Sequence, residues 1–570
     1  MARPRKRLTL ACDTCRSRRV KCDGQRPYCA PCRIRGLDCF YQQLPESPAT
    51  KVETELANVN LRLDYLTMLL SKQQSSPLVQ QSPHTSTSRT VLGSHEDSPF
   101  CLLASDSIMR VLGLDEGFAH AFGRLERANL LLGATTPPGM FFFSQQQVTD
   151  ALATFSDRIH GYYPILPLGF SETYFATLAA PLAPSARTCL VLLVAAIGCV
   201  ARDPAATTGG SSYFDAALQS LPVVLAECTL TSIQCLIFLS IYYCCLLKPC
   251  QAHDYCLIAS FKIQNLFKSG LQGAESDSLE LTHRAYWAIL LLERQSNSEL
   301  SVQLDVAKSN IWSLDEYTPL PNCRRTWHFP PLQSTVAASA HSPDSISTST
   351  STSTTVDQAQ SFFLAEIAMR RMLHRCNWAV TQSPEDGAHR YAPGIALELE
   401  RQLDEWYGYL PPNIQFIRET QHQRQQQEQA SVVLGSLSNF LNVQYYCCKL
   451  SIYWPAVFQA MQDASAPSAQ LLDHCQRFID SYVQLLQRIT FAMDDCLVYK
   501  WTLSVSFFTT TLAALKVSET PCLGSANRDA LRRCLASAAD VDCWRGTEGS
   551  PSLGVLQRTL RERLHEAGLG

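Results

Sequence analysis

The sequence predicts a mainly α-helical protein that begins with a small cysteine-rich unit. Three observations support this fold class. Six cysteines are regularly spaced within residues 12–39, a short heptad pattern follows, and long apolar segments without strand alternation recur after residue 100. We therefore expect the cysteine-rich unit, a short coiled coil and a large all-α domain, in that order.

The charge is divided unevenly along the 570 residues, a length that suggests two to four folded units. Residues 1–41 hold eleven Lys or Arg and three Asp, a balance of +8. Because the whole chain carries −3, residues 42–570 carry −11. A basic amino-terminal segment in an otherwise acidic chain indicates that this segment has a polyanionic partner.

The cysteine pattern is C-x2-C-x6-C-x6-C-x2-C-x6-C, in which the second half repeats the first. No apolar secretory stretch follows the basic start, so we expect reduced thiols that can bind metal. Two tetrahedral zinc ions need eight bonds from six sulfurs, so two sulfurs must bridge, one from each half. The alternative is a redox-active or disulfide cluster, which fits the spacing and the basic flanks less well. The predicted metal ligands are Cys12, Cys15, Cys22, Cys29, Cys32 and Cys39.

Each half should form a short helix and then a strand-like return to its third cysteine. Residues i and i+3 lie on one helix face, so a C-x2-C pair can bind one ion. Gly24 and Pro27 mark the turn between the halves.

Residues 12–39, CDTCRSRRVKCDGQRPYCAPCRIRGLDC, resemble the fungal six-cysteine binuclear zinc cluster family. The resemblance implies two Zn²⁺ per chain, double-stranded DNA as partner and a nuclear location. It also implies that Cys12 and Cys29 bridge. Cys15 and Cys22 would complete one zinc site, and Cys32 and Cys39 the other.

A basic run, Arg16, Arg18, Arg19 and Lys21, follows the second cysteine. Arginine can pair bidentately with guanine in the major groove. The resemblance implies CGG-type half-sites, base contacts near Arg18 and Arg19, and phosphate contacts near Arg16 and Lys21. Many relatives carry lysine where this chain has Arg19, and the different donor geometry can change the preferred base. The alternative for each residue is a solvated charge or a phosphate contact only.

A second basic group precedes the cysteines, formed by Arg3, Arg5, Lys6 and Arg7. Beside a zinc cluster, such a group is best interpreted as a nuclear import signal. Phosphate binding and a merely solubilising role are the alternatives.

A heptad pattern with apolar spacing 4, 3, 4, 3, 4 predicts a short dimerisation helix over residues 52–72. Two parallel copies would form a homodimer; the alternative is one amphipathic helix packed on its own chain. Residues 42–51 and 73–99, rich in Pro, Ser and Gln, are expected to be linkers. The seam residues are Val52, Leu56, Val59, Leu63, Leu66 and Leu70.

Residues 100–520 are expected to form the all-α domain, followed by a helical tail over 521–570. Low-complexity sequence predicts exposed loops at about 334–357 and 418–429. No segment is long and apolar enough to suggest a membrane span. Helical periodicity is clearest at 189–200, 232–247, 255–267, 283–293, 361–376 and 396–409.

Several motifs in this domain, including SIQCLIFLSIYY, HRAYWAILLLER, FFLAEIAMRRMLHR and QYYCCKLSIYWP, resemble the regulatory middle region of fungal transcription factors. The resemblance implies control of activity, through co-regulators or the transcription machinery and through a small-molecule effector. Residues 262–270 depart from the family pattern and leave the effector open. No phosphate-binding loop, dinucleotide motif, HExxH or GxSxG motif is present, so we do not expect an enzyme.

These features together predict a sequence-specific regulator of RNA polymerase II transcription. The family resemblance favours a pathway-specific activator, for example of a secondary-metabolite gene cluster. The main alternative is a ligand-sensing or scaffold protein whose zinc cluster does not select a DNA sequence. A helical enzyme with a DNA anchor is a third, weaker alternative.

Overall fold

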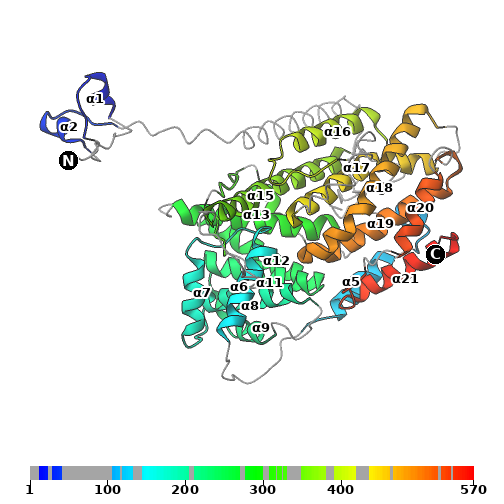
Figure 1. Ribbon diagram of the computed structural model, residues 1–570, viewed down its shortest axis with the longest axis horizontal. Helices are drawn as coiled ribbons and strands as arrows, with labels where there is room; N and C mark the ends of the chain where they lie inside the picture. Colours follow the sequence, from blue (N-terminus) through cyan, green and yellow to red (C-terminus); the bar gives the residue numbers. More distant parts are fainter. Residues whose placement is uncertain are drawn as a thin grey trace, which may run out of the picture. The chain divides into compact units, whose positions relative to one another are not determined.

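A computed structural model of the chain divides into two compact units, residues 1–58 and 59–570, each described here by itself (Figure 1). No residue that the structure describes lies in a β-strand, and the mainly α-helical prediction is confirmed. The described residues are 12–23, 28–40, 106–115, 118–131, 144–204, 211–269, 276–299, 307, 309–315, 317–323, 325–329, 348–379, 391–418, 435–462, 467–523, 528–540 and 544–569.

The first unit contains two short helices, α1 (Asp13–Ser17) and α2 (Ala30–Ile34). The carboxylate of Asp23 accepts a hydrogen bond from the backbone N–H of Ala30 (3.1 Å) and so caps the start of α2. A helix at the start of each half confirms that part of the sequence prediction. The segments that lead from each helix to the third cysteine of its half were predicted to be strand-like, but their described residues are irregular.

Both short helices end on a residue in the left-handed conformation. After α1, the N–H of Val20 donates to the carbonyl of Cys15 (3.1 Å), a six-to-one bond that requires a left-handed residue between them. Arg19 takes that conformation with φ 52°, and Gly36 occupies the matching position of the second half with φ 60°. The repeat seen in the cysteines therefore extends to the backbone.

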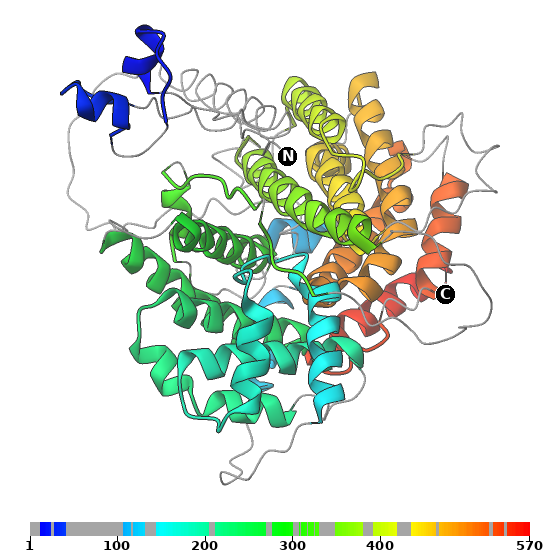
Figure 2. The same ribbon diagram turned by 60° about the vertical axis from the view of Figure 1, so that its left-hand side comes forward.

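The second unit is built from helices that pack on one another in two neighbouring groups (Figures 1 and 2). Its described elements are α4 (Asp106–Val111), α5 (Phe118–Ala128), α6 (Gln145–Phe155), the π-helical η2 (Ser156–His160), α7 (Phe170–Ala179), α8 (Ala186–Arg202), α9 (Ser211–Leu218), α10 (Leu221–Ala226), α11 (Leu230–Cys245), α12 (Pro249–Lys268), α13 (Ser276–Glu299), η3 (Ile311–Leu314), α15 (Thr348–Ala379), α16 (Pro393–Gly408), α17 (Ser436–Gln462), α18 (Ala469–Asp495), η4 (Leu497–Tyr499), α19 (Lys500–Glu519), η5 (Pro521–Leu523), α20 (Arg528–Asp540) and α21 (Pro551–Glu566).

The first group centres on α8 and α11, whose residues are buried on nearly every side. Helices α6 and α12 pack against them. Helix α8 approaches α6 most closely at Gly198, where a Cβ atom would lie 2.0 Å from the carbonyl oxygen of Ala151. Only glycine fits at this crossing without moving a backbone.

The second group is the antiparallel pair α17 and α18, covered by α15, α16 and α19. Buried polar contacts join it to the first group. The hydroxyl of Tyr163 donates to that of Tyr499 (2.8 Å). Within the second group, the carboxylate of Glu366 accepts from Arg370 and Gln444, each at 2.8 Å. Because these groups are buried, their pairing holds the helices in one register.

The last helix, α21, packs on α19 and on α5 from the beginning of the unit. Four leucines line its buried face, which confirms the amphipathic helix expected at the carboxyl end. The carboxylate of Glu126 on α5 is 2% exposed and accepts from the backbone N–H of Ser552 (3.1 Å) at the start of α21. The buried leucines are Leu553, Leu556, Leu560 and Leu564.

The six segments predicted from periodicity lie in α8, α11, α12, α13, α15 and α16, and several of these helices begin earlier than the periodicity indicates. One loop prediction is partly wrong. Residues 348–357 were expected to be a loop, but α15 begins at Thr348. Serine and threonine are weak helix formers, yet each residue added to an existing helix gains a hydrogen bond. The buried apolar segment that follows in α15 provides that existing helix.

Among the residues that the structure describes, no helix combines the length and the apolar character needed to cross a bilayer.

Candidate metal centre and nucleic-acid interface

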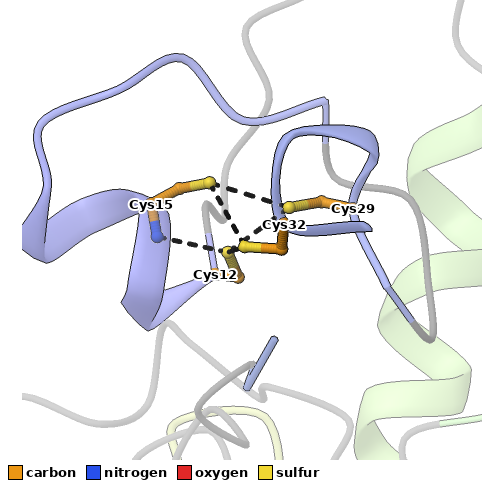
Figure 3. Close-up of side chains that lie close together, drawn as sticks. All are labelled: Cys12, Cys15, Cys29 and Cys32. Carbon is orange, nitrogen blue, oxygen red and sulfur yellow. Dashed lines mark hydrogen bonds between the residues drawn. The ribbon is translucent and has the colours of Figure 1, made fainter. Parts of the chain in front are cut away.

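Four cysteines that lie in the two short helices of the first unit or directly before them point their sulfurs toward one another (Figure 3). The Sγ atom of Cys12 lies 3.6 Å from that of Cys29 and 3.7 Å from that of Cys32. The Sγ atom of Cys15 lies 3.6 Å from that of Cys29 and 3.8 Å from that of Cys32. All four sulfurs lie within 4.8 Å of one another.

These separations fit a tetrahedral zinc site. A Zn–S bond of about 2.3 Å places two sulfurs of one tetrahedron about 3.8 Å apart. The four thiols are also at most 2% exposed, so water does not compete for the metal. The residues present therefore fit thiolate-bound zinc, and the ion, when bound, supplies a fixed charge and four bonds.

The remaining two cysteines complete the cluster. Cys22 lies with Asp23 and Cys29 in a second group of ligand atoms within 4.8 Å. The Sγ atom of Cys39 accepts a hydrogen bond from the backbone N–H of Cys29 (3.3 Å). Cys29 is thus close to both halves, as a bridging sulfur must be. In the scheme with Cys12 and Cys29 as bridges, Cys15 and Cys32 bind different zinc ions, yet their sulfurs also lie close together. The assignment of the bridging sulfurs therefore stays a prediction.

No other core exists in the described part of this unit. Its buried cluster consists of the six cysteines, with only Leu37 packed against it as a partly buried apolar residue. Burial raises the pKa of Cys12 to about 12 and also raises the pKa of Cys29 and Cys32. Without metal these thiols stay protonated at neutral pH, so zinc must displace protons as it binds.

Of the basic residues predicted to contact DNA, Arg16 lies in α1 and the other three follow this helix. Arg18, Arg19 and Lys21 are all exposed, and the side chain of Arg16 lies outside the described residues. Arg19 projects from the left-handed turn that ends α1. A side chain in this conformation costs about 1 kcal/mol relative to glycine. Sequence reasoning selected Arg19 for its charge but had no signal for its backbone.

Two other groups of predicted site residues cannot be placed. The basic arm, Arg3, Arg5, Lys6 and Arg7, and the heptad seam, Val52, Leu56, Val59, Leu63, Leu66 and Leu70, lie outside the described residues.

Comparison with known proteins identifies both parts of the chain. Residues 10–47 match the family described as "Fungal Zn(2)-Cys(6) binuclear cluster domain", and residues 152–408 match "Fungal specific transcription factor domain". The chain is 62% identical, over its whole length and 99% of the relative's, to the protein named "Putative transcription factor ecdB" from Aspergillus rugulosus. The chain is a fungal zinc-cluster transcription factor.

Other relatives of this zinc-cluster transcription factor share less of its length. "Transcriptional activator protein acu-15" of Neurospora crassa is 22% identical over 86% of this chain and 56% of its own. "Sorbicillinoid biosynthetic cluster transcription factor sor3" of Hypocrea jecorina is 51% identical over 41 residues, 7% of this chain and 6% of its own. No solved structure matches.

Membership of this family establishes several points. The zinc-cluster transcription factor holds two zinc ions through its six cysteines, and its family binds DNA. The family consists of transcription factors and not of enzymes, in agreement with the missing catalytic motifs.

Proposed function

We propose that this transcription factor binds CGG-type half-sites as a homodimer in the nucleus and regulates transcription by RNA polymerase II. One observation carries the proposal. The exposed residues Arg18, Arg19 and Lys21 follow a helix that the zinc-binding cysteines hold in place. A short rigid helix with basic residues at its end can enter the major groove.

The two arginines have different backbone positions, which suggests different tasks. Arg18 continues from α1, whereas Arg19 turns away in the left-handed conformation. The matching residue in the second half is Gly36, which takes this conformation without strain. An arginine at a position where glycine would be free of strain favours a direct contact with guanine over a general phosphate contact.

The wider role follows from the remaining features. The seam over residues 52–72 would pair two chains, and the basic arm would direct import into the nucleus. Co-regulators or the transcription machinery would bind the helical domain. The relatives named as an activator and as a biosynthetic cluster factor favour a pathway-specific activator of a secondary-metabolite gene cluster.

The variant Arg18→Ala/Arg19→Ala tests the central claim. Each bidentate arginine contact contributes about 1–3 kcal/mol of discrimination. We therefore expect about 100-fold weaker binding to a selected CGG-containing site, with weak non-specific binding retained. Fluorescence anisotropy at fixed salt would measure both, on full-length protein whose zinc content is two per chain.

The matched control is Arg33→Ala/Arg35→Ala, which removes the same charge from exposed positions at the end of α2. It should weaken specific and non-specific binding by the same small factor, because only counterion release changes. If the first variant keeps the site preference of the natural protein, the protein is a scaffold or ligand sensor rather than a sequence-specific factor.

A further inference from the structure

The hydroxyl of Thr14 joins the two halves of the first unit without a sulfur atom. Thr14 lies in α1, between the zinc-binding residues Cys12 and Cys15. Its Oγ1 atom donates a hydrogen bond to the backbone carbonyl of Asp38 (2.5 Å), which directly precedes Cys39 in the second half. This length is within the range expected for a hydroxyl donor. Helix α1 is therefore attached to the backbone 24 residues further along the chain.

The sulfur atoms alone do not fix the direction of α1. The Sγ atoms of Cys12 and Cys15 face those of the second half at separations of 3.6–3.8 Å (Figure 3). Two attachment points define an axis, and a helix of five residues can still rotate about that axis. Successive residues of a helix point about 100° apart, so Thr14 lies on a different side of α1 from Cys15. Its hydrogen bond is a third attachment point, away from the axis, and so opposes this rotation.

The same residue supports the first of the two predicted base-reading arginines. The carbonyl of Thr14 accepts hydrogen bonds from the backbone N–H of Arg18 (3.4 Å) and from the hydroxyl of Ser17 (3.1 Å). Arg18 thus lies one helical turn after Thr14, and Arg19 follows it in the left-handed conformation. A rotation of α1 would therefore move both arginines together relative to the second half of the unit.

The matching position of the second half cannot make this hydrogen bond. The two halves are offset by 17 residues, as Cys12 and Cys29 show, so Pro31 matches Thr14. Proline has neither a hydroxyl nor a backbone N–H to donate. Pro31 instead lies in the first turn of α2, where its fixed φ is favourable. The hydroxyl is thus present in the half that carries the predicted base-reading residues, which favours a role in DNA recognition over a general role in folding.

Base recognition requires a more exact placement of side chains than phosphate binding does. A bidentate arginine contact needs two N–H groups aligned with O6 and N7 of guanine. The groups of a binding site must be held within about 0.5 Å and about 10–20° of their productive geometry. Phosphate contacts depend mainly on charge and tolerate small rotations. Loss of the Thr14 hydrogen bond should therefore weaken binding to a specific site more than binding to unrelated DNA.

We propose that Thr14 is a positioning residue for DNA recognition. Its hydroxyl fixes the direction of α1 relative to the second half of the unit, and α1 in turn places Arg18 and Arg19 against the bases. Thr14 acts through these two arginines and does not itself contact a base. The proposal rests on the function proposed above, because it requires that the protein selects a DNA sequence.

Thr14→Val tests the proposal, because valine keeps the shape of the side chain and removes the donor. Fluorescence anisotropy on the full-length protein at fixed salt would compare a duplex selected from random sequences by the natural protein with an unrelated duplex. We expect about tenfold weaker binding to the selected duplex, less than about twofold change for the unrelated duplex, and an unchanged zinc content. Thr14→Ala, a better helix former than valine, should give the same result. Thr14→Ser restores the hydroxyl and should bind the selected duplex within about twofold of the natural protein.

Asp38→Asn is the matched control, because it changes the side chain of Asp38 and keeps the backbone carbonyl that accepts from Thr14. It removes one negative charge, so it should strengthen binding to both duplexes by the same small factor and leave their ratio unchanged. The proposal is overturned if Thr14→Val and Thr14→Ala keep the natural ratio, if Thr14→Ser behaves like Thr14→Val, or if the variants lose zinc. If selection with the natural protein yields no preferred sequence, the proposed function itself fails and this proposal fails with it, so the two failures are distinguishable.

Discussion

Removal of zinc is expected to unfold the first unit and abolish specific DNA binding while the second unit stays folded. The buried cluster of the first unit consists of six cysteines and the partly buried Leu37, so no apolar core remains when the metal is gone. Structural zinc contributes about 10–16 kcal/mol to the folding of small zinc peptides. A strong chelator should therefore weaken binding to a selected site by several orders of magnitude.

Three measurements on the full-length protein check this prediction. Metal analysis should give two zinc ions per chain before chelation, and anisotropy should report loss of the specific complex afterwards. The far-ultraviolet circular dichroism should change little, because most helical residues belong to the second unit. Added Zn²⁺ should restore binding. A metal-free protein that still selects its site would contradict the assignment of the six cysteines.

Gly198→Ala is expected to destabilise the second unit strongly. The new Cβ atom would lie 2.0 Å from the carbonyl oxygen of Ala151 and 2.7 Å from its carbonyl carbon. Both are backbone atoms of α6, so no side chain can rotate away and the two helices must separate. Overpacking of a core costs about 1–3 kcal/mol and more when a backbone must move, so we expect the upper end or beyond. Thermal unfolding followed at 222 nm would show a midpoint lowered by several degrees.

Gly554→Ala gives the opposite expectation for the same substitution. This glycine lies in α21, and a Cβ atom there would meet no atom within 4 Å. Alanine should then raise stability by about 0.5–1 kcal/mol, because it loses less conformational entropy in a helix. Equal effects of the two substitutions would show that helix propensity, rather than the crossing of α6 and α8, controls stability at Gly198.

Much of the candidate metal centre could be predicted from sequence because its six cysteines and the basic run all lie within residues 12–39. The spacing of six cysteines identifies the thiols that can bind metal, and the metal brings them together without help from the rest of the chain. The basic run is adjacent in sequence to these cysteines and so is positioned by the same helix. What the sequence could not indicate was the left-handed backbone of Arg19, which follows from how α1 ends.

The helices of the second unit were also predictable where the apolar periodicity is strong, as in α8 and α11. Composition misassigned residues 348–357, because propagation of α15 outweighs the weak helix propensity of serine and threonine.

The sequence by itself therefore determined the two zinc ions, the position of the basic residues and the location of the helices with the clearest apolar periodicity. Only the tertiary structure decided which helices meet at Gly198 and which charges meet among α16, α17 and α18. Glu400 and Arg477 are 77 residues apart, and Arg418 is the first residue of a segment that composition had assigned to an exposed loop. Such contacts depend on how whole helices pack, and the periodicity of one helix does not specify the side chains that its neighbours present to it.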